Sequence, residues 1–256
     1  CLISNFLADR SANKGKCAHC CRWHYKVNVR LKDGSIKELE INDKNKDAFE
    51  FLLEEDFRPG ELYEIVQDEH GGYILNSKDM CLMPRLNEIL GIGMDSLKIE
   101  GRLKSGSYVG LVTRVYRKYL DRYQRNVRLE IEKEDIKNLE KSFNRKFTKG
   151  YLFGEENKEI TNTYRPNNMG VKIGKVIDFR NNKVYIRLED TLNQGDGIRI
   201  VGKEDVGFYV NKMEVNRLLV NKANRNDIVT INVKGNISIN NEVYKTSDVK
   251  LSEEIL

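Results

Sequence analysis

The chain has 256 residues, of which 39% are hydrophobic and 32% charged, and its formal net charge is +5. This balance is typical of one large or two smaller globular, soluble domains, and no apolar run approaches the roughly 20 residues of a membrane-spanning helix. The five cysteines are odd in number and crowded near the start of the sequence. That pattern disfavours a secreted disulfide scaffold and favours the reducing cytoplasm.

Residues 1–23 form a polar, glycine-containing segment with four of the five cysteines, and the stretch KGKCAHCCRW ends at the only tryptophan, Trp23. Four interpretations of this cluster remain open. Cys17 and Cys20 have the spacing of a redox CxxC pair, although the strand–helix context of such a site is missing. A zinc site would use Cys17, Cys20 or Cys21, and His24.

The third interpretation is an iron–sulfur cluster, which takes four cysteine thiolates from widely spaced loops. Cys1, Cys17 and Cys81 provide three of them. The fourth interpretation is that some cysteines are bystanders, which suits Cys20 or Cys21 individually. Because Cys1 already lies within a motif, we expect the chain to be a fragment that lacks an N-terminal portion.

The next segment has the period-two pattern of β-strands. Polar and apolar residues alternate from Tyr25 to Val29, Asp33-Gly34 is a hairpin turn signal, and residues 36–41 complete the predicted hairpin. Residues 60–75 again predict strand–turn–strand, with the turn at Gly71-Gly72.

A helical region follows. Pro84 suits the first turn of a short helix over residues 84–90, and DSLKIE (residues 95–100) predicts a strand. From Ser107 to about Arg125 the apolar residues recur with the i, i+3, i+4, i+7 spacing of an amphipathic helix. A second helix is predicted over residues 133–142. This alternation is typical of a parallel α/β sheet or a β/α barrel.

The long predicted helix is strongly basic. Between Arg102 and Arg128 the only acid is Asp121, and four cations share the polar helix face: Arg114, Lys118, Arg122 and Arg125. Such a face is typical of a site that binds RNA phosphates, and it is equally typical of a solvated helix surface.

The predicted strand over residues 95–100 and the loop after it form a second candidate site. Side chains alternate along a strand, so Lys98 and Glu100 point the same way, and catalytic groups of β/α barrels stand at the C-terminal ends of strands. Lys98, Glu100, Arg102 and Lys104 are therefore candidates to bind an anionic substrate. A solvated edge strand, or a Lys–Glu pair inside a barrel, explains them equally well.

Beyond Pro166 the composition shifts to short alternating strands separated by Asn-Asn or glycine-containing turns, at residues 171–179, 183–189, 227–233 and 236–240. They predict a small all-β barrel or sandwich. The predicted domains are a partial β/α-barrel catalytic domain with the Cys-rich loop and a β insertion, a helical connector, and a small β-barrel domain. Their ranges are 1–128 (insertion 24–75), 129–165 and 166–256.

Four stretches occur in the order found in one family: CLISNFLADRSANKGKCAHCCRW, ILNSKDMCL, DSLKIEGRLKSGSYV and FNRKFTKGYLFG. From Cys1 to about Gly154 the chain resembles the collagenase-like peptidases, family 32 of the unassigned (U) peptidase class. The resemblance implies an α/β plus β fold, namely the C-terminal part of a TIM-like β/α barrel followed by a small all-β barrel domain. The layout is most similar to the prephenate-dependent tRNA uridine hydroxylases of this family.

That resemblance implies an enzyme with a four-iron–four-sulfur cluster that converts the wobble uridine of tRNA to 5-hydroxyuridine, with prephenate as the oxygen-donating cosubstrate. Cys1, Cys17 and Cys81 match the family's cluster ligands. A fourth ligand would precede Cys1, with Cys21 in reserve, and Cys20 is expected to be dispensable.

The substrate-binding residues are predicted from their chemistry. Prephenate is a dicarboxylate that needs cationic partners, for which Arg102, Lys98 and Arg10 are candidates. An unstacked uridine is typically held by aromatic stacking, for which Trp23 is a candidate, although a lone tryptophan beside a strand is more often part of a core. Lys104 and the basic helix face would contact tRNA phosphates.

Two alternatives remain. The first is a collagenase-like peptidase, as the family is named, although these motifs contain neither an HExxH zinc site nor a recognisable Ser–His–Asp or Cys–His arrangement. The second is a zinc-containing RNA-binding module without catalysis.

Overall fold

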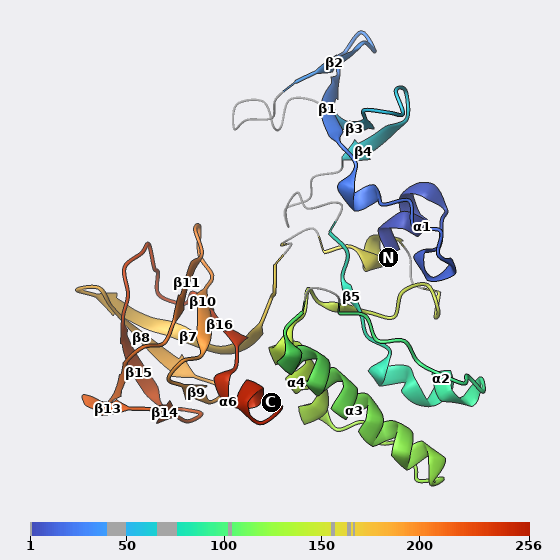
Figure 1. The fold of residues 1–256 in the computed structure, drawn as a ribbon. Coiled ribbons are helices and arrows are strands. Elements are labelled where there is room, and N and C mark those ends of the chain that lie inside the picture. Colours follow the sequence, from blue (N-terminus) through green and yellow to red (C-terminus); the bar gives the residue numbers. More distant parts are fainter. Residues whose placement is uncertain are drawn as a thin grey trace. The chain divides into compact units, whose positions relative to one another are not determined.

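The computed structural model describes residues 2–39, 50–65, 76–101, 104–154, 157–162, 165 and 167–256. The chain divides into two compact units, the first made of Cys1–Lys78 and Thr148–Pro166 and the second of Asp79–Phe147 and Asn167–Leu256 (Figure 1). No helix in the described ranges is long and apolar enough to cross a membrane.

The first unit combines short helices with a four-stranded antiparallel sheet in the order β2-β1-β3-β4. The strands are β1 (Tyr25–Arg30), β2 (Ile36–Glu38), β3 (Glu50–Glu55) and β4 (Leu62–Ile65). The helices are α1 (Leu2–Ala8), η1 (Ala12–Lys14), η2 (Cys20–Arg22) and α5 (Asn157–Ile160). Val29 and Leu52, from the two central strands, are buried in its core.

The predicted hairpin of this unit is confirmed. β1 pairs with β2, and Gly34 has a φ of 82°, a left-handed conformation that glycine adopts without steric cost. The second strand is shorter than predicted, because it ends at Glu38. Most of the second predicted hairpin, including its Gly71-Gly72 turn, lies outside the described residues.

The second unit begins with β5 (Asp79–Met80) and a group of helices. These are η3 (Met83–Arg85), α2 (Leu86–Gly91), α3 (Gly106–Gln124) and α4 (Lys133–Ser142), followed by β6 (Phe147–Thr148) at the boundary between the units. The Ser105 hydroxyl accepts a hydrogen bond from the Tyr108 amide and so caps α3. Leu111 and Val115 of α3 pack in one core with Leu139 of α4. All three predicted helices are confirmed.

The strand predicted over residues 95–100 is wrong, because residues 96–100 have an irregular backbone with mostly exposed side chains. A strand is stable only when its N–H and C=O groups pair with a neighbour, and no described strand pairs with this segment. The strand pairs of the four-stranded sheet, of the eight-stranded sheet and of β9 with β14 are antiparallel. These residues therefore do not display the predicted β/α barrel.

The C-terminal part of the chain, from Val171 to Ser247, forms a strongly curled antiparallel half-barrel, with eight strands in the order β11-β10-β16-β7-β8-β15-β12-β13 (Figure 1). Its strands are β7 (Val171–Arg180), β8 (Lys183–Leu188), β10 (Gly197–Ile200), β11 (Val206–Tyr209), β12 (Met213–Val215), β13 (Leu218–Val220), β15 (Ile228–Asn232) and β16 (Glu242–Ser247). A further pair, β9 (Leu192–Asn193) and β14 (Lys222–Ala223), and the final helix α6 (Val249–Glu253) complete the unit.

The inner face of this half-barrel is apolar. Ile173, Val176 and Val184 are fully buried in one core cluster with Ile186 and Val229. Three of the four predicted strands are confirmed as β7, β8 and β15. The fourth predicted strand, over residues 236–240, is wrong. In a strand its two isoleucines would lie on the same face, but here Ile237 packs in the core while Ile239 is exposed in a turn.

Candidate functional site

The cysteine loop of the first unit is held in place by a short hydrogen-bond network. The Ser4 hydroxyl of α1 donates to the Arg10 carbonyl at 2.7 Å and accepts from the Ala18 amide at 2.8 Å. His19 then turns the chain with a φ of 58°, a left-handed conformation that is uncommon outside glycine. The loop that carries Cys17 is therefore anchored at both sides of the cysteine.

The cysteines of this loop lie in different environments. Cys17 is partly exposed, and its sulfur accepts a hydrogen bond from the His19 amide at 3.4 Å. Cys20 is buried, and burial raises the pKa of its thiol. Cys21 is exposed. Cys20 is thus a core residue, while Cys17 and Cys21 remain accessible. The expectation that Cys20 is dispensable stays a prediction.

Trp23 lies against Arg58 rather than facing an open pocket. Its indole N–H donates to the Ala18 carbonyl at 2.9 Å, and the Arg58 guanidinium lies 3.8 Å from the ring centroid. One face of the ring is therefore covered by a cation–π contact, and the centroid of the Tyr25 ring lies 6.1 Å from that of Trp23. Arg10, predicted to bind the cosubstrate, has an exposed side chain.

Cys81 lies in the second unit, between β5 and η3, where it is buried in the helical core. Burial raises the pKa of the Cys81 thiol against the opposing effect of hydrogen bonds from the Met83 amide and the Tyr116 hydroxyl. Tyr116, on α3, was predicted only as an apolar core residue. No sequence signal connects it with Cys81, because the helix pattern shows which face is buried but not which group its hydroxyl meets.

The three proposed cluster ligands do not all lie within one described unit. Cys17 lies in the first unit and Cys81 in the second, and Cys1 lies outside the described residues. Within the described ranges, no three His, Cys, Asp or Glu side chains are grouped so as to hold a metal ion. The convergence of these cysteines on one cluster therefore stays a prediction.

The predicted anion-binding segment is exposed. Lys98 and Glu100 form an ion pair of 2.9 Å, with 85% and 72% of their side chains accessible, and the hydrogen bond from Lys98 holds the pKa of the Glu100 carboxyl below its usual range. Arg102 lies outside the described residues. Lys104 lies over the Phe143 ring, and burial lowers the pKa of its amine.

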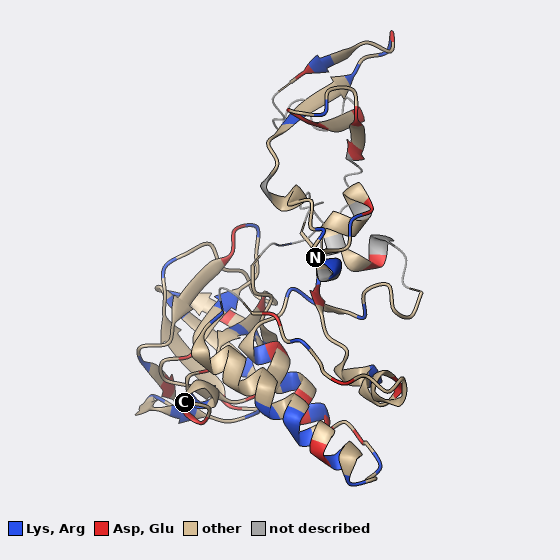
Figure 2. Cartoon of the chain, turned by 45° about the vertical axis from the view of Figure 1, so that its right-hand side comes forward, with Lys and Arg blue, Asp and Glu red and all other residues tan. Residues whose placement is uncertain are grey.

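The basic face of α3 is partly neutralised by acids at the start of α4. Lys118 pairs with Glu132 at 2.8 Å and with Asp135 at 2.7 Å, and Arg122 pairs with Glu132 at 3.0 Å. Figure 2 shows basic residues along the exposed side of α3. Arg114 donates to the Glu254 carbonyl at 3.4 Å, while Arg125 forms no ion pair with any described residue. Arg114 and Arg125 therefore remain more available to phosphates than Lys118 and Arg122.

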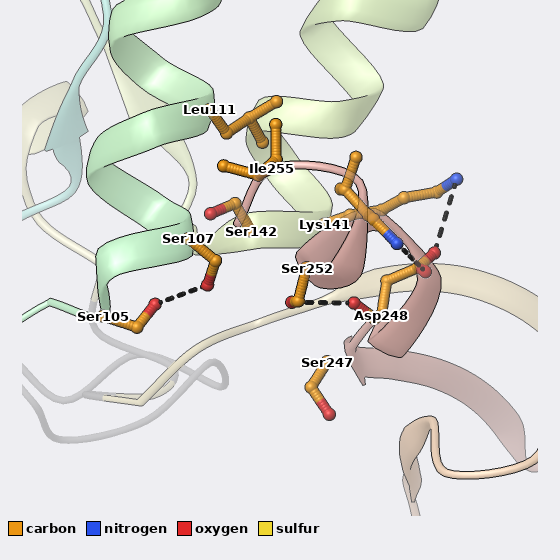
Figure 3. A pocket seen from close by; sticks show the side chains of 10 residues that line it. Ser105, Ser107, Leu111, Lys141, Ser142, Ser247, Asp248, Ser252 and Ile255 are labelled. Carbon is orange, nitrogen blue, oxygen red and sulfur yellow. Dashed lines mark hydrogen bonds and ion pairs between the residues drawn. The ribbon is translucent and has the colours of Figure 1, made fainter.

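A cavity of about 110 Å³ lies between α3, α4 and α6 of the second unit (Figure 3). Ser105 and Ser107 share a hydrogen bond of 2.9 Å on one side, and Ser252 donates to the Asp248 carbonyl at 2.9 Å on the other. The Lys141 amine points toward the Asp248 carboxylate, 3.8 Å away. Hydroxyls and a carboxylate suit water or a neutral polar group better than a dicarboxylate, so this cavity is not the expected prephenate site.

These observations define one unit of short helices and an antiparallel four-stranded sheet that carries the Cys17 loop, and a second unit of helices and a curled antiparallel half-barrel that carries Cys81. The sequence profile of Peptidase family U32 matches residues 1–162. The chain belongs to this family.

Relatives within the family carry two kinds of name. The chain is 38% identical over 134 residues to the tRNA hydroxylation protein P of Escherichia coli (strain K12), which covers 47% of this chain and 30% of that protein. It is 27% identical over 235 residues to the tRNA hydroxylation protein P of Haemophilus influenzae, covering 83% of this chain and 51% of that protein. It is also 27% identical over 257 residues to a collagenase of Porphyromonas gingivalis, covering 96% of this chain and 61% of that protein. The chain thus spans between 30% and 61% of the length of these three relatives.

Proposed function

We propose that this chain is part of a tRNA-modifying enzyme that hydroxylates the wobble uridine to 5-hydroxyuridine. The observation that carries this proposal is the similarity, over 83% of the chain, to a protein named for tRNA hydroxylation. The reaction replaces a ring C–H by C–OH, a two-electron oxidation in which prephenate would supply the oxygen atom and a separate redox partner would accept the two electrons. A place in the cytoplasm, where tRNA is modified, belongs to the same proposal.

A four-iron–four-sulfur cluster held by Cys1, Cys17 and Cys81 is the cofactor of this proposal. Two of these cysteines have the same local pattern, in which the backbone amide two residues later is directed at the sulfur: His19 for Cys17 and Met83 for Cys81. Hydrogen bonds to cluster sulfurs tune the reduction potential of iron–sulfur centres, so these environments suit cluster ligands. The cluster would supply redox chemistry, and the fourth ligand would come from the longer protein or from Cys21.

The remaining roles follow from charge and exposure. Lys98, Arg102 and Arg10 would bind the two carboxylates of prephenate, and the open Lys98–Glu100 pair can exchange Glu100 for such a carboxylate. Glu100 is ionised at neutral pH, since the hydrogen bond from Lys98 lowers its pKa; once a prephenate carboxylate has taken its place on Lys98, Glu100 would be able to accept a proton. Trp23 would stack on the flipped base, and Lys104, Arg114, Lys118, Arg122 and Arg125 would contact tRNA phosphates. The barrel expected from the family would be formed with other parts of the longer protein.

The collagenase-like peptidase is the second candidate, because a relative named collagenase matches 96% of this chain. It is tested separately, by incubating the full-length protein with type I collagen and with gelatin and measuring newly formed amino termini. Peptide cleavage that survives Cys17→Ala, together with unchanged tRNA, would favour this candidate over the hydroxylase.

Nucleoside mass spectrometry of tRNA tests the hydroxylase proposal. Deleting the full-length gene should abolish 5-hydroxyuridine and its derivatives, and the wild-type gene should restore them. A Cys17→Ala copy should not restore them, whereas a Cys20→Ala copy should, because Cys20 is not one of the proposed cluster ligands. Unchanged tRNA in a deletion strain that has no second hydroxylase would refute the proposal.

A further inference from the structure

The outer face of the β7–β8 hairpin brings like charges directly opposite one another. Lys175 of β7 lies opposite Arg187 of β8, and Arg180 lies opposite Lys183 at the end of the hairpin. Side chains on alternate positions of both strands, including Val176 and Ile186, are fully buried on the inner face. The four cations therefore belong to the outer face, on either side of Tyr185.

This arrangement is fixed by the turn and costs stability. Asn181 and Asn182 connect the strands with φ values of 52° and 56°, the pair of positive angles that defines the commonest two-residue hairpin turn and sets the register of the strands. Like charges directly opposite across two strands destabilise a sheet. The sequence therefore keeps an unfavourable charge arrangement that the fold itself does not need.

Acids on the same face neutralise it only in part. Asp178 contacts Arg180 at 3.3 Å. Glu242 lies opposite Lys175 on β16, and the Lys175 charge helps to lower the pKa of its carboxyl, but its ion pair, at 2.9 Å, is with Lys172. Glu214 lies further away, on β12 opposite Thr230. Three cations are left without an ion pair among the described residues: Lys175, Lys183 and Arg187.

We propose that these three residues, the hairpin cation face, bind the phosphate backbone of the tRNA. This inference rests on the proposed function and assigns the half-barrel a part in substrate binding. Lys183 and Arg187 are four positions apart on β8, or roughly 13 Å at about 3.3 Å per residue, so the face reaches beyond a single phosphate. Binding to a polyanion would relieve the repulsion between Lys175 and Arg187. Phosphate binding therefore explains why two like charges lie opposite each other in the sheet.

Fluorescence anisotropy with labelled tRNA and the full-length protein, over a series of KCl concentrations, tests this inference. The triple variant Lys175→Gln/Lys183→Gln/Arg187→Gln is compared with a matched triple, Lys203→Gln/Lys222→Gln/Arg225→Gln, which removes the same charges from exposed positions outside the hairpin. The hairpin triple should bind at least about tenfold more weakly at low salt. Its slope of log K against log[salt] should be smaller by about 2 to 3, because each lost phosphate contact removes about 0.7 to 0.9.

Thermal unfolding separates binding from folding. The hairpin triple should have a Tm no lower than wild type, since it removes opposed like charges, while the matched triple should keep wild-type tRNA affinity. Equal weakening by both triples, or none by the hairpin triple, would overturn the inference and leave the proposed function standing. Competition by polyglutamate as strong as by unlabelled tRNA would also overturn it, in favour of an acidic protein partner. Failure of wild-type protein to bind tRNA at all would instead count against the proposed function.

Discussion

Lys245 and Asp196 form an ion pair of 2.7 Å in which neither side chain is exposed to solvent. Lys245 comes from β16 and Asp196 immediately precedes β10. Asp196 also accepts hydrogen bonds from the Asn193 amide at 2.8 Å and the Val249 amide at 3.0 Å. The pair therefore joins the half-barrel to the start of α6, and Lys245 reaches a second carboxylate, Asp248, at 3.0 Å.

Replacing Lys245 by methionine should strongly destabilise the protein. The substitution Lys245→Met keeps the length of the side chain but leaves the Asp196 carboxylate buried without its cation, which typically costs about 3 to 5 kcal/mol. Urea unfolding followed by circular dichroism measures the effect. Lys172→Met is the control, because Lys172 pairs with Glu242 at a more exposed position and its loss should have little effect on stability. Equal effects of the two substitutions would contradict the prediction.

The same cluster makes stability depend on pH. Burial acts to raise the pKa of Asp248, but the Lys245 charge and the Leu251 amide outweigh it, so the pKa lies below its usual range. A carboxyl with a lowered folded-state pKa stabilises the protein above its unfolded-state pKa, about 3.9 for Asp, and this stability is lost as the pH falls toward the folded-state value.

Urea unfolding should therefore give a constant contribution from Asp248 between about pH 7 and 5 and a declining one below about pH 4. In Lys245→Met the decline should begin at a higher pH, because burial is then opposed by the Leu251 amide and the Lys141 charge but no longer by Lys245. An identical acid dependence in wild type and variant would show that Lys245 does not control the ionisation of Asp248.

Tyr119 connects α3 with the start of α4. Its hydroxyl donates to the Asp135 carboxylate at 2.6 Å and accepts from the Glu132 amide at 2.8 Å, and its side chain is fully buried. Tyr119→Phe removes both bonds and should cost about 1 to 3 kcal/mol in the free energy of unfolding. Tyr123→Phe is the matched control on the same helix, where Tyr123 is exposed; a cost there as large as for Tyr119→Phe would contradict the assignment.

Local pattern predicted the helices well, because an amphipathic stripe with caps carries its own signal. The helix over residues 133–142 was predicted with the bounds it has. The strand predicted over residues 95–100 was wrong although polar and apolar residues alternate there, because alternation does not supply the neighbouring strand that backbone pairing needs. The strand predicted over residues 236–240 was also wrong, because the alternation of polar and apolar residues there does not show that only Ile237 enters the core.

The candidate site was less predictable because its contacts join distant positions. The Glu132 and Asp135 carboxylates that neutralise Lys118 belong to another helix, so sequence alone presented a basic face without its partners. The buried state of Cys20 depends on tertiary packing, and the neighbouring Cys21 in the same motif is exposed. The hydroxyl of Tyr116 beside Cys81 had no signal either, because a tyrosine in an apolar stripe looks the same whether or not its hydroxyl meets a thiol.

The different environments of the cysteines give the sharpest test of the proposed cofactor. Iron and acid-labile sulfide should be measured on full-length protein purified without oxygen. Cys17→Ala and Cys81→Ala should each lower both contents strongly, because each removes a proposed cluster ligand. Cys20→Ala should leave them unchanged, because Cys20 is not one of the proposed cluster ligands. Loss of iron in Cys20→Ala but not in Cys17→Ala would contradict the ligand assignment, and zinc without sulfide in the wild-type protein would favour the RNA-binding module without catalysis.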